Sequence, residues 1–152
     1  MFVRTVQIFE TLYRQVYRCL VRASAAMQVM DGERARADLA DATARIALSP
    51  ALYRVVTTMP KGAFAIIRQF TDGRSAIQSR SYRQIDLVCA PRPDSDVSDK
   101  MPAAEVASPT LQETFLDLRT RLDPGTADGL AAQLRALDSA WRAMKRTHWG
   151  SR

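Results

Sequence analysis

The sequence predicts an all-α protein, a helical bundle of about five to six helices with long first and last helices. Two observations support this prediction. Apolar residues recur every three or four positions near both ends of the chain, as on one face of a helix. No segment of useful length alternates apolar and polar residues as a half-buried strand does. The 152 residues suffice for one hydrophobic core, so we expect a single domain over residues 1–152.

The first helix is expected over residues 2–30, where large apolar residues share one side. These residues are Phe2, Val6, Phe9, Tyr13, Val16, Leu20, Met27 and Met30. Asp31-Gly32 is expected to end this helix, because glycine accepts the left-handed backbone that stops helices. A second helix is predicted over residues 33–48.

Two proline-containing pairs are predicted to punctuate the next part of the chain. Ser49-Pro50 is expected to begin a new helix, because serine is a good N-cap and proline fits the first helical position. Met59-Pro60 marks the next break. A short apolar helix with one charge, Arg68, is predicted after it over residues 63–70.

The segment SAIQSRSYRQID, residues 75–86, is unusually polar for this chain. Ile77, Tyr82 and Ile85 nevertheless lie at helical spacing, so we predict a helix with one apolar edge. Residues 90–109 contain four prolines and several acidic residues, which predicts a surface loop.

Two helices are predicted after this loop. The first begins at Ser108-Pro109 and has four large apolar residues on one side: Leu111, Phe115, Leu118 and Leu122. Asp123-Pro124-Gly125 is expected to end it, and Thr126 is expected to cap the last helix.

The charge pattern argues against several classes of partner. The net charge is +6, and nineteen of the 22 basic residues are arginines, but they are scattered and accompany no zinc-finger or RNA-binding motif. We therefore expect no nucleic acid partner. No long apolar run and no signal peptide is present, so we expect a cytoplasmic protein without membrane contact. Cys19 and Cys89 are then expected to be free thiols.

The single histidine of the chain, His148, lies on the apolar side of the last predicted helix. That side consists of Leu130, Leu134, Leu137, Trp141, Met144 and His148, spaced four, three, four, three and four residues apart. A histidine there is either a core residue bonded to a backbone carbonyl or an axial ligand of haem iron, for which one protein ligand suffices.

Arg68 interrupts the apolar stretch AFAIIRQF, where an unpaired guanidinium would be costly to bury. Its side chain either reaches the surface or an acidic partner, or binds a carboxylate of a ligand, since the planar guanidinium matches a carboxylate bidentately. The sequence alone leaves both interpretations open.

Three segments resemble, in order, the tryptophan 2,3-dioxygenase family of haem enzymes. FVRTVQIFETLYRQV is similar to the family's opening helix, through Phe2, Gln7, Phe9 and Glu10. FAIIRQFTDGRSAIQSRSYRQID is similar to its Phe-x-x-Phe-Arg and Ser-x-x-Gln-Ser-x-x-Phe/Tyr-Arg-x-x-Glu segments, through Phe64, Arg68, Ser75, Gln78, Ser79, Tyr82, Arg83 and Asp86. WRAMKRTHW is similar to the stretch that ends in the haem-ligating histidine, which corresponds to His148.

The resemblance implies an enzyme that binds haem b between helices and inserts both atoms of O₂ into the indole ring of L-tryptophan, giving N-formylkynurenine. It implies these roles: His148 as iron ligand, Ser75, Gln78 and Arg83 beside the haem, Arg68 on the substrate carboxylate, and Phe64, Phe2 and Val6 lining the substrate pocket. It also implies a homo-oligomer.

The chain departs from the family pattern in two ways. Val6 occupies the position of the family's distal histidine, so contact with the indole N–H is lost, and a haem-dependent monooxygenase of another aromatic substrate is an alternative. The chain stops four residues after His148, before the family's glycine-rich loop, so we expect a truncated or minimal member. A catalytically inactive helical scaffold of the family is the remaining alternative.

Overall fold

The computed structural model describes residues 2–70, 79–89 and 109–150, and all regular structure in these ranges is helical. The helices are α1 Phe2–Gln28, α2 Gly32–Thr57, α3 Lys61–Phe70, α4 Arg80–Cys89, α6 Leu111–Leu118 and α7 Pro124–Gly150. The predicted all-α class with long first and last helices is confirmed. The predicted polar loop over residues 90–109 lies, except for its last residue, outside the described ranges.

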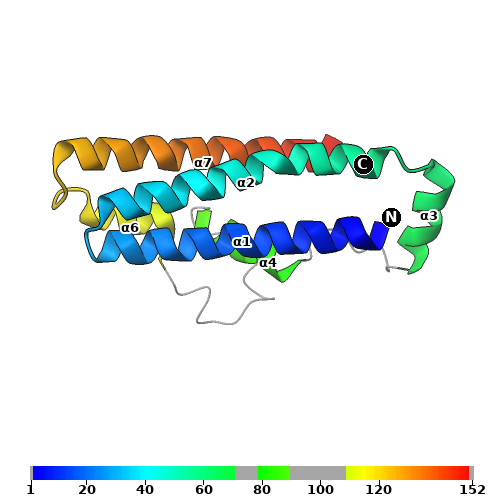
Figure 1. Ribbon diagram of the computed structural model, residues 1–152, viewed down its shortest axis with the longest axis horizontal. Helices are drawn as coiled ribbons and strands as arrows, with labels where there is room; N and C mark the ends of the chain where they lie inside the picture. The colour runs from blue at the N-terminus through cyan, green and yellow to red at the C-terminus, as the bar shows by residue number, and fades with distance from the viewer. Residues whose placement is uncertain (1, 71–78, 90–108, 151–152) are drawn as a thin grey trace.

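Three long helices form the body of the molecule. In Figure 1, α1, α2 and α7 run along the long axis, and α3 lies at the end where α1 begins and α7 ends. Helix α2 packs against both α1 and α7, while α4 and α6 pack against α1. Within the described ranges, none of the helices has an apolar stretch sufficient to span a bilayer.

The core forms where the apolar stripes of the long helices meet. Its central side chains are almost completely buried: Tyr13, Val16, Leu20 and Met27 from α1, Leu39 and Ile46 from α2, and Leu130, Leu137, Trp141 and Met144 from α7. The stripes predicted for α1 and α7 are therefore confirmed at these positions. Burial of such stripes removes apolar surface from water and is the main force that holds the helices together.

The turn between α1 and α2 corrects the role predicted for Gly32. The left-handed residue is Met30, with φ 62°, and the backbone N–H groups of Met30 and Asp31 donate to the carbonyls of Met27 and Ala26, each over 2.9 Å. This is the Schellman pattern of a helix end. Gly32 begins α2 instead, and a Cβ atom there would lie 2.1 Å from Thr126 Cγ2 of α7. Glycine is needed at position 32 for close packing of two helices.

The predicted break at Ser49-Pro50 is wrong, because α2 continues through both residues to Thr57. Proline lacks an N–H group, so the carbonyl of Ile46 loses its usual donor, which normally disfavours proline inside a helix. Packing of α2 between α1 and α7 compensates for this cost, since Ile46 and Tyr53 on either side of Pro50 are buried. Tertiary contacts therefore outweigh the local signal.

Two predicted helix starts are shifted by one or more residues. Helix α6 is capped by Thr110, not by Ser108, and Thr110 and Glu113 exchange side-chain and backbone hydrogen bonds in a capping box. Helix α7 is capped by Asp123, whose Oδ1 accepts from the Thr126 N–H over 2.9 Å. Pro124 therefore occupies the first helical position, where its missing N–H has no cost.

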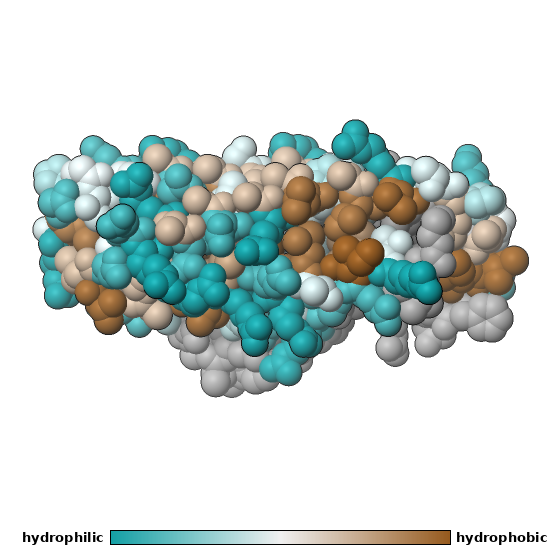
Figure 2. Space-filling model, in the orientation of Figure 1, coloured by the Kyte–Doolittle hydropathy of each residue, from teal (hydrophilic) through white to brown (hydrophobic). Residues whose placement is uncertain are grey.

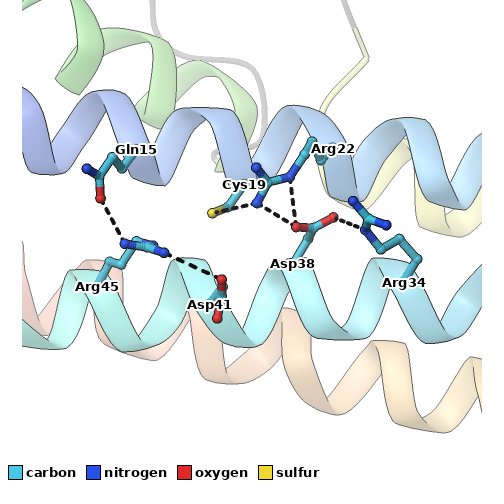
Figure 3. Close-up of polar contacts among 7 residues, drawn as sticks. All are labelled: Gln15, Cys19, Arg22, Arg34, Asp38, Asp41 and Arg45. Atoms are coloured by element: carbon cyan, nitrogen blue, oxygen red, sulfur yellow. Dashed lines mark hydrogen bonds and ion pairs between the residues drawn. The ribbon is translucent and has the colours of Figure 1, made fainter.

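A buried carboxylate fixes α2 against α1 in the half of the bundle away from α3. Asp38 is 6% exposed at the side chain, and its two oxygens bind Arg22 of α1, with N–O distances down to 2.7 Å, and Arg34 of α2 over 3.2 Å (Figure 3). Arg22 also donates to the sulfur of Cys19 over 3.4 Å. The carboxylate raises the pKa of Arg22 through its hydrogen bond and its charge. Both cysteines are free, as predicted.

Apolar side chains are exposed where α1 and α2 approach α3. Ile8 of α1 is 50% exposed, and Leu48 and Val55 of α2 are 58% and 44% exposed. Figure 2 shows brown residues gathered over this part of the surface. A surface of this kind is compatible with association of further chains, so the expected homo-oligomer stays a prediction.

Candidate functional site

Helix α4 begins at a carboxylate that comes from α1. Ser79 caps the helix, because its Oγ accepts from the Tyr82 N–H over 3.2 Å and its carbonyl accepts from the Arg83 N–H. The same hydroxyl donates to Glu10 Oε2 over 2.5 Å, and the hydroxyl of Ser81 donates to Glu10 Oε1 over 2.6 Å. Both oxygens of Glu10 are thus used to hold the first turn of α4 against α1.

The other end of α4 is joined to α7 by a second carboxylate. Asp86 Oδ1 accepts from the indole Nε1 of Trp141 over 3.0 Å, and it also binds the ammonium group of Lys145. The ammonium lies 5.4 Å from the centre of the Trp141 ring, which adds a cation–π contact. Trp141 is 3% exposed, so its indole N–H needs an acceptor within the protein, which Asp86 provides.

The space between α1, α2, α4 and α7 is filled by aromatic rings. Tyr13 lies at the centre of this aromatic cluster, with ring centroids 5.7 Å from Tyr82 and 6.4 Å from Trp141. The rings of Tyr82 and Trp141 are 4.9 Å apart, and those of Phe9 and Tyr53 are 4.6 Å apart. The cluster joins helices that are distant in sequence.

The phenol groups of the aromatic cluster form a small polar centre in the core. The hydroxyls of Tyr13 and Tyr53 are 3.0 Å apart, and both lie within 3.9 Å of the sulfur of Met144. Burial raises the pKa of Tyr13, Tyr53 and Tyr82 above the usual tyrosine value. All three phenols are therefore neutral at neutral pH and take part as hydrogen-bonding groups, not as charges.

The predicted site residues fall into three groups. Ser75 and Gln78 lie outside the described ranges. Val6 on α1 is 46% exposed, and Arg83 on α4 is half-buried. For the others the structure describes the helical backbone only: Phe2 in α1, Phe64 and Arg68 in α3, and His148 in α7. The first turns of α1, helix α3 and the last turns of α7 lie at the same end of the molecule (Figure 1).

The register of α7 places residue 148 one turn after the buried Met144, on the continuation of the buried stripe. Among the described residues, no cluster of three or more histidine, cysteine or acidic side chains has the arrangement of a metal site. The described residues therefore contain no preformed cluster of the kind that binds zinc or non-haem iron.

Comparison with models of protein families, with curated proteins and with solved structures finds no match to this chain.

The sequence did not predict the two carboxylate contacts of α4 or the tyrosine pair. Glu10, Ser79 and Asp86 belong to the segments that resemble the dioxygenase family, but helical spacing alone does not tell which segments meet. A signal for the tyrosine pair is present in the sequence: Tyr13 lies on the apolar stripe of α1, and a buried phenol needs a hydrogen-bonding partner. The identity of that partner depends on the packing of α2.

Proposed function

We propose that this protein is a haem-dependent dioxygenase of the tryptophan 2,3-dioxygenase type, which inserts O₂ into the indole ring of L-tryptophan to give N-formylkynurenine. One observation carries the proposal. The three segments that resemble this family are in mutual contact: Glu10 of the first binds Ser79 and Ser81 of the second, and Asp86 of the second binds Trp141 and Lys145 of the third. These contacts bring the three segments together in one part of the bundle, as a shared site would require.

The metal cofactor in this proposal is haem b. Haem needs one axial protein ligand, and His148 continues the buried stripe of α7 at the end of the bundle where α1 begins. When bound, the haem would supply activation of O₂, while the protein would supply orientation and exclusion of water. In this proposal Ser75, Gln78 and Arg83 assist in holding the haem.

The substrate side of the proposed site would be formed by α1 and α3. Arg68 would bind the carboxylate of the amino acid substrate, and Phe64, one turn earlier on α3, would contact its aromatic ring. Phe2 and Val6 would approach from α1. A cytoplasmic homo-oligomer with L-tryptophan and O₂ as its small-molecule partners belongs to the same proposal.

We expect His148→Ala to abolish specific haem binding. The purified chain mixed with hemin should develop a sharp Soret band, which collapses in His148→Ala because the axial ligand is removed. Added imidazole should restore the band in this variant, since a free imidazole can replace a ligand but cannot replace a packing contact. Absorption spectra and far-ultraviolet circular dichroism of the same samples measure ligation and folding separately.

The exposed Arg146→Ala variant, two residues away, serves as the matched control and should keep the wild-type spectrum. A Soret band that is unchanged in His148→Ala would contradict the ligand assignment. A wild-type chain that folds but develops no Soret band would favour the alternative of an inactive helical scaffold.

Arg68→Leu is expected to weaken binding of L-tryptophan by about 10- to 100-fold, the loss of one charge-assisted bidentate contact. Tryptamine, which lacks the carboxylate, should bind equally to both proteins. Titrations of the reconstituted protein followed by the Soret shift measure both affinities. Equal losses for L-tryptophan and tryptamine would show that Arg68 does not bind the carboxylate.

The side chain at position 6 favours a second candidate reaction. Valine can neither donate nor accept a hydrogen bond, so nothing at this position of α1 would contact an indole N–H. A monooxygenase that acts on another aromatic substrate fits this apolar position as well. Reaction under ¹⁸O₂ distinguishes the two candidates, because a dioxygenase product carries both labelled atoms and a monooxygenase product carries one.

A further inference from the structure

A cleft of about 330 Å³ lies between the end of α4, helix α6 and the middle of α7. Its floor is apolar, with Leu111 and Leu137 each 2% exposed, and its walls include the half-buried Phe115 and Leu134. None of the residues assigned above to haem or substrate lines it. Its volume is at the lower end of the range found for small-molecule sites.

The rim of the cleft has an uncompensated positive charge. Arg135, Asp138 and Arg142 of α7 all line it, but the Arg142 Nε already donates to Asp138 Oδ1 over 2.9 Å. Arg135 is exposed and has no ion-pair partner among the described residues. An anionic group at the mouth of the cleft would meet this free guanidinium and could bind it bidentately.

Two further polar side chains, Gln112 of α6 and Cys89 at the end of α4, line the cleft, and neither is charged at neutral pH. Cys89 at the end of α4 contributes its thiol to the lining, and burial raises the pKa of this thiol to about 12. The thiol is therefore neutral at neutral pH, so it neither repels an anion nor acts as a nucleophile. Among the described residues that line it, the cleft thus combines a mostly apolar interior with one cation, Arg135, that has no ion-pair partner.

We propose that this cleft binds a small amphipathic carboxylate, with its apolar part between α6 and α7 and its carboxylate on Arg135. The volume limits the ligand to a short aliphatic chain or a single ring system, and the free guanidinium selects an acid over an alcohol of the same size. This site is independent of the proposed dioxygenase activity.

Octanoate and octan-1-ol are suitable probes, because they share an apolar chain and differ in the anionic group. Isothermal titration of the whole chain should detect octanoate binding. Arg135→Gln should weaken octanoate binding about tenfold and leave octanol binding unchanged. Leu116→Glu places a carboxylate at the 45% exposed rim residue and should weaken binding of both probes.

Arg146→Gln is the matched control, because position 146 is about three turns further along the same side of α7 and outside the cleft. It should change neither affinity. The proposal would be overturned if the wild-type chain bound no octanoate, if Arg135→Gln weakened both probes equally, or if Arg146→Gln had the same effect as Arg135→Gln. An unaltered affinity in Leu116→Glu would likewise show that octanoate binds elsewhere.

Discussion

Tyr13→Ala is expected to lower the free energy of unfolding by about 3–5 kcal/mol, the usual cost of removing a large aromatic side chain from a core. Tyr13 is 1% exposed and contacts residues of four helices: its own neighbour Phe9, Tyr53 of α2, Tyr82 of α4, and Trp141 and Met144 of α7. Urea unfolding followed by circular dichroism measures the change.

Tyr13→Phe measures the contribution of the hydroxyl group to stability separately from that of the ring. The ring contacts with Tyr82 and Trp141 are retained, but the Tyr53 hydroxyl loses its partner at 3.0 Å in a buried environment. The expected cost is about 0.5–1.5 kcal/mol, the usual net contribution of one hydrogen bond, because the Tyr53 hydroxyl keeps its contact with the Met144 sulfur. Val29→Ala, at a residue that is 74% exposed, is the control and should change stability by less than about 0.5 kcal/mol. If Tyr13→Phe were as unstable as Tyr13→Ala, the ring would contribute little beyond the hydroxyl, contrary to this prediction.

The periodicity of the chain was sufficient to predict the fold class and the buried stripes of α1 and α7. It was insufficient at Pro50 and Gly32, for two different physical reasons. At Pro50 the local cost of proline in a helix is outweighed by packing on both sides of α2, which no local pattern records. At Gly32 the absence of a Cβ is required by Thr126, which lies 94 positions later in the chain.

For the candidate site, the sequence supplied the residue types but not their partners. Glu10 and Asp86 have ordinary helical positions, and only the packing of α4 between α1 and α7 shows that both carboxylates bind across helices. The cleft of α6 and α7 could not be predicted at all, because it depends on where three helices meet. Local propensity determines single helices well, whereas sites between helices depend on long-range packing.

The double variant Glu10→Ala/Asp86→Ala is expected to release α4 while the three long helices stay folded. Glu10 accepts two hydroxyl groups at the start of α4, and Asp86 accepts the Trp141 N–H and binds Lys145 near its end. Loss of both carboxylates removes these side-chain contacts of α4 with α1 and α7, and it leaves the Trp141 N–H buried without its acceptor. Each loss should cost about 1–3 kcal/mol.

Amide hydrogen exchange measures this release directly, because it reports local opening of each helix. Residues 80–89 should exchange about 30- to 1000-fold faster in the double variant, the consequence of lowering the local opening free energy by about 2–4 kcal/mol. Residues 35–46 of α2 are not among the partners of Glu10 and Asp86 named above, so their amides should keep their protection from exchange. The isosteric Asp86→Asn retains an acceptor for the indole N–H and should show a smaller effect than Asp86→Ala. Equal acceleration of exchange in α2 and α4 would mean that the two carboxylates stabilise the whole bundle. Helix α4 would then not open separately from the long helices, and the two carboxylates would not be specific attachments between the segments that carry the proposed site.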